Sequence, residues 1–184
     1  LTYRDKLTYQ NMVKGGPLYP LNSFMNQGIA HAIWGSANLP ASPDEFAHEV
    51  YSFFGIGTAL QELYISHGRM TPEMWDILAE GAEWSRRNRG VLVDTHWIGG
   101  DPDKLEIYGC ASWQSNKAII MLRNPDEKER TITLDIGRAL ELPPFANTKY
   151  TFKSPWQKDK SKKKGVILKA GATHTFELAP FEVL

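Results

Sequence analysis

The sequence predicts an α/β region over residues 1–90, followed by an antiparallel β-sandwich over residues 91–184. Up to about Arg89, segments with helical spacing of apolar residues alternate with short strand-like segments. After Gly90 the helical period disappears, and about seven short strand-like segments follow, separated by turn-forming residues. The helix–strand–helix–strand–helix order of the first region implies parallel strands joined by crossover helices.

The first helix and the first strand are predicted over residues 3–15 and 17–23. Apolar side chains of residues 3–13 share one helical face, and Gly15 is a suitable helix end. The segment "PLYPLNS" then predicts a short apolar strand, although Pro17 and Pro20 disfavour strand pairing. Residues 26–42, rich in small side chains, are expected to form a long connection.

Two further helices have clear start signals. Ser42 is a predicted N-cap, with Pro43 at the first helical position and Glu45 three residues after the serine. The segment ends in glycine at residues 55 and 57, and residues 59–66 predict a buried strand. A second cap, Thr71 with Pro72, begins a helix that we expect to end near Gly90.

The β half contains one segment, "AIIML" at residues 118–122, that is apolar throughout. Such a segment is typical of a central strand covered on both faces. In the first half, by contrast, two strands and three helices cannot cover their own apolar faces well. It is therefore interpreted as the last part of a larger α/β domain.

Composition excludes several classes of protein. The 21 basic and 21 acidic residues give zero formal net charge, so we expect no nucleic-acid partner and no anionic membrane surface. No apolar run approaches the ~20 residues that a membrane span requires. The single Cys110 excludes an internal disulfide framework and a thiolate-rich metal site.

Four segments of the chain resemble a known family. They are "YRDKLTYQNMVKGGPLYPLNSFMNQGIAHA", "FFGIGTALQELYIS", "WDILAEGAEWSRRNRGVLVDTHWIGGDPDKLEIYGCASW" and "LRNPDEKERTITLDIGRALELP". Together they resemble the C-terminal region of secreted bacterial glycoside hydrolases related to the α-galactosidase clan, some of which are labelled "enterotoxin". The resemblance covers nearly the whole chain.

The resemblance implies the C-terminal end of a (β/α)8 barrel, its last two strands and helices, joined to the β-sandwich. Residues 17–23 would be the seventh barrel strand and the segment "LQELYIS" the eighth. The family's catalytic carboxylates lie on earlier strands, so no catalytic residue is assigned in this chain. We expect a part of a glycosidase that acts on α-linked sugars, with the missing N-terminal part of its own protein as a possible partner.

In a barrel, binding groups collect where strands end and the following loops begin. This rule selects Asn22, His31, Trp34 and His67 as candidate carbohydrate-binding residues. Polar side chains bond sugar hydroxyls, and an indole stacks on the C–H face of a sugar ring. The alternative is that Trp34 packs its own loop and that His31 belongs to the core. His67 and Arg69 follow the second strand and are weaker candidates.

No metal or cofactor is expected. The five histidines show neither HxH nor HExxH spacing, and Asp94 with His96 supplies only two of the three or four ligands of a zinc site. Glu62 lies inside an apolar strand, and a structural ion pair is the favoured interpretation. The run "KDKSKKKG" at residues 158–165 predicts a solvated hairpin tip.

The stretch "NRGVLVDTHWIGGDPDKLEIYG", residues 88–109, concentrates acids and a histidine around two glycines. We interpret it as the joint between the two halves, with Asp94 and His96 bonded to backbone or to each other and Trp97 packed into the junction. Two other functions stay open. The sandwich is a carbohydrate-binding module if Trp97, Trp113 and Trp156 share an exposed face, or the chain is an interaction or assembly domain whose apolar surface a partner covers.

Overall fold

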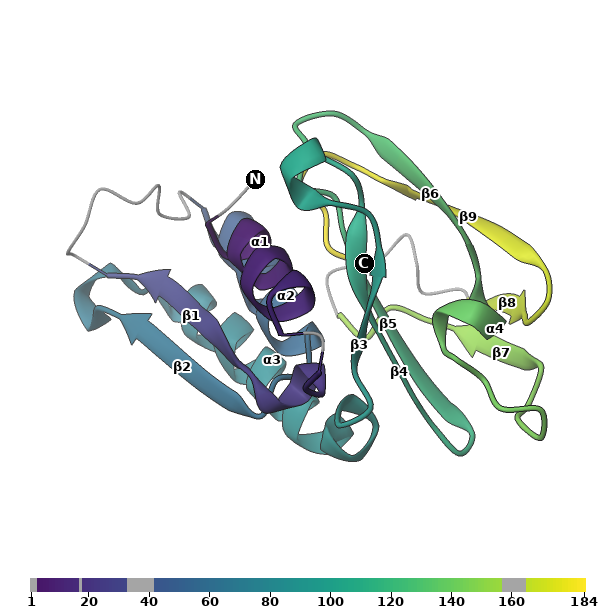
Figure 1. Ribbon diagram of the computed structural model, residues 1–184. Coiled ribbons are helices and arrows are strands. Elements are labelled where there is room, and N and C mark those ends of the chain that lie inside the picture. The colour runs from purple at the N-terminus through teal and green to yellow at the C-terminus, as the bar shows by residue number, and fades with distance from the viewer. Residues whose placement is uncertain (1–2, 17, 33–41, 157–164) are drawn as a thin grey trace.

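The computed structural model describes residues 3–16, 18–32, 42–156 and 165–184. It shows a mixed α/β fold with several antiparallel sheets. A pair of parallel strands lies at one end, helices lie next to it, and the strand-rich half lies on the other side of the helices (Figure 1).

The predicted helix over residues 3–15 is present, but only its first part is α-helical. Helix α1 (Tyr3–Leu7) continues directly into the π-helix η1 (Thr8–Lys14). The wider π geometry continues to the end, where the N–H of Gly15 donates to the carbonyl of Gln10 at 3.0 Å.

The first strand lies later in the chain than the sequence predicts. Residues 21–23 form a 3-10 turn, η2 (Leu21–Ser23), and the strand is β1 (Met25–His31), within the segment expected to be a connection. A Cβ at Gly28 would lie 2.1 Å from the carbonyl oxygen of Glu62. The small residues of this segment therefore allow the neighbouring strand to approach closely.

Strand β1 pairs in parallel with β2 (Leu60–Ile65), as predicted for strands joined by a crossover helix. That helix is α2 (Pro43–Gly55), and α3 (Pro72–Leu92) follows β2 after the turn η3 (His67–Arg69). Both predicted caps are confirmed: the Ser42 hydroxyl accepts from the N–H of Glu45, and the Thr71 hydroxyl accepts from the N–H of Met74, each at 3.2 Å. Helix α3 continues past Gly90 to Leu92.

Seven strands follow in the described part of the second half. They are β3 (His96–Gly99), β4 (Tyr108–Gln114), β5 (Lys117–Arg123), β6 (Arg130–Asp135), β7 (Lys149–Phe152), β8 (Val166–Lys169) and β9 (Thr173–Leu178). They pair antiparallel in the orders β3-β4-β5, β6-β9 and β7-β8. Short helical turns η4 (Pro102–Lys104) and α4 (Ile136–Ala139) complete the described elements.

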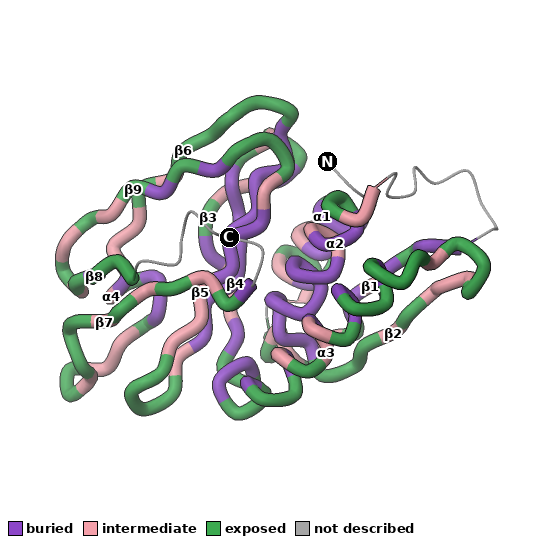
Figure 2. The backbone as a smooth tube through the Cα atoms, turned by 180° about the vertical axis from the view of Figure 1, so that it is seen from behind, coloured by how far each residue is buried: buried purple, intermediate pink, exposed green. Residues whose placement is uncertain are grey.

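Strand β5 lies between the two hydrophobic cores of the protein. Met121 belongs to the core formed with α2 and α3, whereas Leu122 belongs to the core within the strand-rich half. Figure 2 shows buried backbone concentrated in α2, α3 and β4, around this junction. The expectation of a central strand covered on both faces over residues 118–122 is met only in part. Met121 and Leu122 are buried, whereas residues 118–120 are half-buried and β5 is the last strand of its sheet.

The stretch over residues 88–109 joins the two halves, as expected from the sequence. The Asp94 carboxylate accepts from the Trp113 N–H at 3.1 Å, and His96 Nε2 donates to the Ala139 carbonyl at 2.7 Å. The Trp97 ring stacks on the Tyr108 ring with centroids 4.7 Å apart. All three contacts lie within residues 91–184, so they fix the stretch to the strand-rich half. Contact with the first half comes from the Thr95 hydroxyl, which donates to the Ile56 carbonyl at 2.7 Å, and from the Trp97 ring, whose centroid lies 5.2 Å from that of Tyr9.

Two further acids of this stretch contact the N-terminal helix. Asp101 lies 3.4 Å from the Lys14 ammonium, and Asp103 lies 3.5 Å from that of Lys6. Ion pairs between these two segments add to the contact between the halves. In the described part of the chain, no helix is long and apolar enough to cross a membrane.

Candidate functional site

The carboxyl ends of β1 and β2 meet at one edge of the parallel pair, and backbone bonds hold them there. The N–H of Ser66 donates to the His31 carbonyl at 3.0 Å, and the N–H of Arg69 donates to the Ser66 carbonyl at 2.9 Å. The His31 imidazole is buried and its Nε2 donates to the Arg69 carbonyl at 3.1 Å. Its ring also meets the Phe46 ring edge-on, with centroids 5.4 Å apart.

His31 therefore has a structural role at this edge, because its ring is hydrogen-bonded to the Arg69 carbonyl. In the neutral ring, with Nε2 donating to a carbonyl, Nδ1 is an acceptor, and among the described residues that buried atom has no hydrogen-bond partner. A buried polar atom without a partner carries a desolvation cost. One polar ligand group or water at this position would remove that cost.

His67, on η3, lies at the surface beside the buried histidine. Its ring lies 6.0 Å from that of Trp75 in the first turn of α3, and the indole is 40% exposed. Trp75 lies outside the apolar stripe of α3, which contains Met74, Ile77 and Leu78. The rule that binding groups follow the ends of strands does not select Trp75. Its place in the first turn after the Thr71 cap, outside the apolar stripe of the helix, could have indicated an exposed aromatic residue.

Of the two other predicted residues, Asn22 lies elsewhere and Trp34 is not described. Asn22 precedes β1, and its carbonyl accepts from the N–H of Ala59 at 2.8 Å, just before β2 begins. It therefore lies at the amino ends of the two strands, because the strand begins after residue 23 instead of ending there. Trp34 lies outside the described residues.

Glu62 lies on the face of β2 that points away from the helices. Gln61 bonds Ser85 of α3, so its neighbours in the strand point to the other side. The Glu62 carboxylate accepts from the Tyr64 hydroxyl, and this hydrogen bond raises the pKa of Tyr64 above its ordinary value. Tyrosine is thus the partner of this acid, where the sequence predicted an ion pair.

None of the side chains named at this edge is a carboxylate. Glycoside hydrolysis requires two carboxyl groups about 5 to 9.5 Å apart that flank the scissile bond. The groups at the edge are two imidazoles, a guanidinium, a hydroxyl and an indole, which suit hydrogen bonding and stacking. Within the ranges that the structure describes, no group of three histidine, cysteine, aspartate or glutamate side chains could hold a metal ion.

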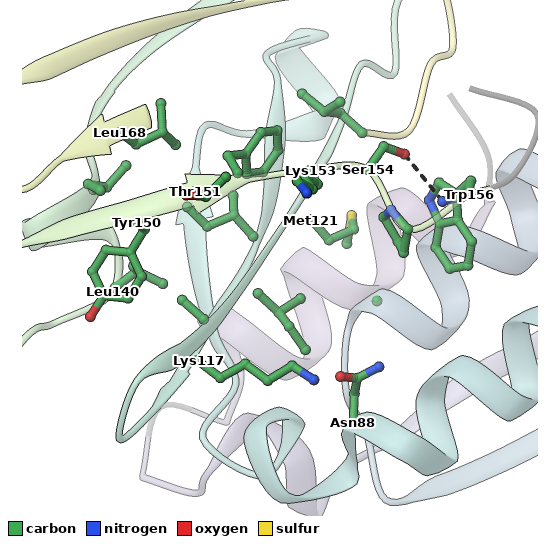
Figure 3. A pocket seen from close by; sticks show the side chains of 18 of the residues that line it. Asn88, Lys117, Met121, Leu140, Tyr150, Thr151, Lys153, Ser154, Trp156 and Leu168 are labelled. Atoms are coloured by element: carbon green, nitrogen blue, oxygen red, sulfur yellow. Dashed lines mark hydrogen bonds between the residues drawn. The ribbon is translucent and has the colours of Figure 1, made fainter. Parts of the chain in front are cut away.

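A cavity of about 560 Å³ lies elsewhere, between the strand-rich half and the helices. Strand β5 and residues 149–156 line it, together with Tyr51, Trp84 and Asn88 of α2 and α3 (Figure 3). Trp156 stacks on Tyr51 with centroids 3.8 Å apart, and its centroid lies 5.2 Å from that of Trp84. Since this indole is buried between two rings, it offers no free face to a sugar.

The three tryptophans of the β half do not form a stacking platform. Trp97 packs against the core shared with the helices, Trp113 packs against the core within the strand-rich half, and Trp156 is buried. The Trp113 indole N–H donates to the Tyr150 hydroxyl at 2.8 Å. These three side chains therefore do not share an exposed face.

The fold is similar to that of a known glycoside hydrolase. No family model and no curated protein matches the chain. Solved structures that match include AmyP, an amylase, as a variant in complex with maltotriose, with a TM-score of 0.52, and in complex with maltose, with a TM-score of 0.51. Both alignments have 9% sequence identity and cover 86% of this chain but only 39% of the AmyP chain. The chain thus has a glycoside hydrolase-like fold and spans well under half of that enzyme's length.

Proposed function

We propose that this chain is the C-terminal part of a glycoside hydrolase that acts on α-linked sugars. The observation that carries the proposal is the structural match to 39% of a larger glycoside hydrolase chain. The segment resemblance favours a relative of the α-galactosidase clan. In this proposal, β1 and β2 are the last two strands of a (β/α)8 barrel, residues 91–184 are a mainly structural β-sandwich, and the catalytic carboxylates belong to barrel strands outside these 184 residues.

The exposed apolar surface of the first half supports a larger barrel. Leu18, Met25, Leu60 and Leu63 are each about half exposed or more, all on or next to the parallel pair. Two parallel strands with helices on one side leave such surface in water. Further β/α units would cover it and pair the open strand edges.

The proposed sugar-binding residues are His31, His67 and Trp75, with Arg69 beside them. They lie at the carboxyl ends of β1 and β2, where a barrel of this class binds its ligand. Trp34 stays a candidate from the sequence. Asn22, at the amino ends of the strands, would bind sugar only at the opposite end of a barrel, so we give it no role.

The test uses the gene that encodes this chain together with its upstream sequence. We expect further β/α units with carboxylates at strand ends, and hydrolysis of α-linked oligosaccharides by the whole protein. Trp75→Ala should raise KM more than it lowers kcat, because it removes a ring contact with the ground state as well as the transition state. Trp113→Ala is the matched control, since that indole packs in the other core. An upstream sequence without such units would refute the proposal.

A further inference from the structure

The face of the parallel pair that points away from the helices changes in character along the strands. At the amino ends of β1 and β2 it carries Met25 and Leu60, which pair in register and are each about half exposed. The next side chains of β2 on this face are Glu62 and Tyr64, since side chains two apart in a strand point the same way. Helices α2 and α3 lie on the other side of the pair (Figure 1). The polar side chains of β2 are thus nearest the end where a barrel binds its ligand.

Packing alone does not require this pair of polar side chains. The interior of a barrel is filled mainly by bulky branched apolar residues, and a carboxylate without a hydrogen-bond partner is costly there. Glu62 accepts from the hydroxyl of Tyr64, two residues further along the same strand. Because this bond is local, it does not join two elements of the fold. A role outside the packing of the strands is therefore worth testing for the pair.

The hydrogen bond fixes the direction in which Tyr64 can act. Its single hydroxyl proton is donated to Glu62, so the phenol oxygen is an acceptor toward any ligand. A carboxylate also only accepts. The bond to Glu62, with desolvation and the charge of Glu62, raises the pKa of Tyr64 above its ordinary value, so the phenol keeps its proton at neutral pH. Both groups therefore require a hydrogen-bond donor from the ligand.

The neighbouring strand places small residues beside the pair. Ala30 of β1 is the partner of Tyr64 in register and carries only a methyl group. Gly28 has no side chain, and a Cβ there would lie 2.1 Å from the Glu62 carbonyl oxygen. On the β1 side, the pair is thus bordered by backbone and a methyl group. The Glu62 carboxylate and the phenol oxygen are the polar groups that this part of the face offers to a ligand.

We propose that Tyr64 contacts the sugar in the glycosidase proposed above and that Glu62 is its positioning residue. The phenol oxygen accepts a hydrogen bond from one sugar hydroxyl, and Glu62 holds the phenol proton away from the sugar. The ligand class is a sugar that presents a hydroxyl group, as a donor, near the carboxyl end of β2. This inference rests on the proposed function, in which this face of β1 and β2 lies inside a barrel.

The test uses the intact protein, including the sequence upstream of this chain, and a p-nitrophenyl α-glycoside that it hydrolyses. The inhibitors are the free sugar and its derivatives in which one hydroxyl at a time is replaced by fluorine, which cannot donate a hydrogen bond. We expect one replacement to raise the inhibition constant about fivefold or more. In Tyr64→Phe this penalty should disappear, because the acceptor is gone. Tyr19→Phe, at an exposed tyrosine before β1, is the matched control and should keep it.

Glu62→Gln tests the positioning role. The amide can donate to the phenol oxygen and release the phenol proton toward the sugar, so the fluorine penalty should shrink while the thermal unfolding midpoint stays the same. The absorbance of ionised tyrosine, titrated with and without Tyr64→Phe in each background, isolates Tyr64. Its pKa should be closer to the ordinary value in Glu62→Gln than in the unmodified protein.

The outcomes separate this inference from the proposed function. An intact protein that hydrolyses no α-glycoside overturns both. Hydrolysis without a fluorine penalty that depends on Tyr64, or with an equal penalty in Glu62→Gln, overturns the inference and leaves the proposed function standing. Reduced stability of Tyr64→Phe with unchanged penalties would also overturn it, because the pair would then be structural only.

Discussion

The Arg123 guanidinium lies 2.7 Å from the Asp5 carboxylate, and both side chains are almost completely buried. This ion pair joins α1 to β5, from opposite halves of the chain. Arg123 also pairs with Glu49 of α2 at 3.1 Å, and Glu49 pairs with Arg4 at 2.6 Å. The Tyr108 hydroxyl donates to Asp5, and burial, with the charge of Asp5, raises the pKa of this tyrosine well above its ordinary value.

Arg123→Met should strongly destabilise the protein. The substitution leaves the buried Asp5 carboxylate without its nearest cation, and breaking such a pair costs about 3–5 kcal/mol. Urea unfolding of the two proteins measures this loss. Arg87→Met removes an exposed pair with Glu83 and should change the unfolding midpoint very little.

The double variant Asp5→Asn, Arg123→Met separates a charge effect from a packing effect. It removes both charges of the pair, so it should recover part of the stability that Arg123→Met loses. The comparison also needs Asp5→Asn alone. If the double variant loses as much stability as Asp5→Asn and Arg123→Met lose together, the two residues act independently.

His48 should make stability depend on pH near neutrality. Burial lowers the pKa of His48 below 6.5, the positive charge of Arg123 lowers it further, and nearby acids including Glu182 only partly oppose this. The unfolded chain therefore binds a proton near pH 6.5 that the folded chain does not yet bind. Stability contributed by neutral His48 is complete above pH 6.5 and decreases as pH falls toward the lowered pKa.

Urea unfolding at about pH 7.5 and about pH 5.5 tests this dependence on His48. The free energy of unfolding should decrease on acidification, with at most about 1.4 kcal/mol per pH unit from this one proton. His48→Gln should reduce the pH slope. An equal slope in His48→Gln and the unmodified protein would contradict the assignment.

Gly81 allows α2 and α3 to pack closely. A Cβ at this position would lie 2.5 Å from Val50 and 2.9 Å from Phe54, both on the facing helix. Gly81→Ala should therefore destabilise the protein by about 1–3 kcal/mol, although alanine is the better helix former.

Gly90→Ala is the matched control on the same helix. Its Cβ would meet only the Gln114 side-chain oxygen at 3.3 Å, which can move away. Alanine should then stabilise α3 by up to about 1 kcal/mol. Thermal unfolding of both variants should move in opposite directions, and a shift in the same direction would refute the packing argument.

Local sequence signals predicted the helices better than the first strand. The caps at Ser42 and Thr71 use only residues within four positions, so the start of each helix was visible in the sequence. Helix α3 passes Gly90 because Val91 and Leu92 are buried in the junction, which is a tertiary effect. The strand β1 was missed because its polar residues find partners far away in sequence; buried Asn26, for example, accepts from Thr8.

The candidate site depended on this strand assignment. Shifting the strand to Met25–His31 moved Asn22 to the opposite end and moved His31 from a loop to the strand terminus. His67 was placed correctly because β2 was predicted within one residue at each end. Trp75 was missed because a residue on a helix surface comes near a strand end only through the packing of α3 on the sheet.

Substitution of Asp94 tests whether the stretch over residues 88–109 joins the two halves or binds a ligand. Its carboxylate accepts from the Trp113 N–H at 3.1 Å, which ties the end of α3 to β4. Asp94→Ala should lower the free energy of unfolding by about 1 kcal/mol, the usual contribution of one hydrogen bond. Asp76→Ala, at an exposed aspartate of α3, is the control and should change it less.

If the chain is part of the glycosidase proposed above, the same variant should leave sugar binding by the intact protein unchanged. Asp94 follows the last residue of α3, whereas His67 and Trp75 lie before and within its first turn, so the length of a 21-residue helix separates them. At about 1.5 Å per residue this is about 30 Å, too far for direct contact with a sugar at the strand ends. Isothermal titration of the unmodified protein and Asp94→Ala measures both affinities. Lost binding at unchanged stability would make Asp94 a ligand residue, and normal binding at reduced stability establishes the joint.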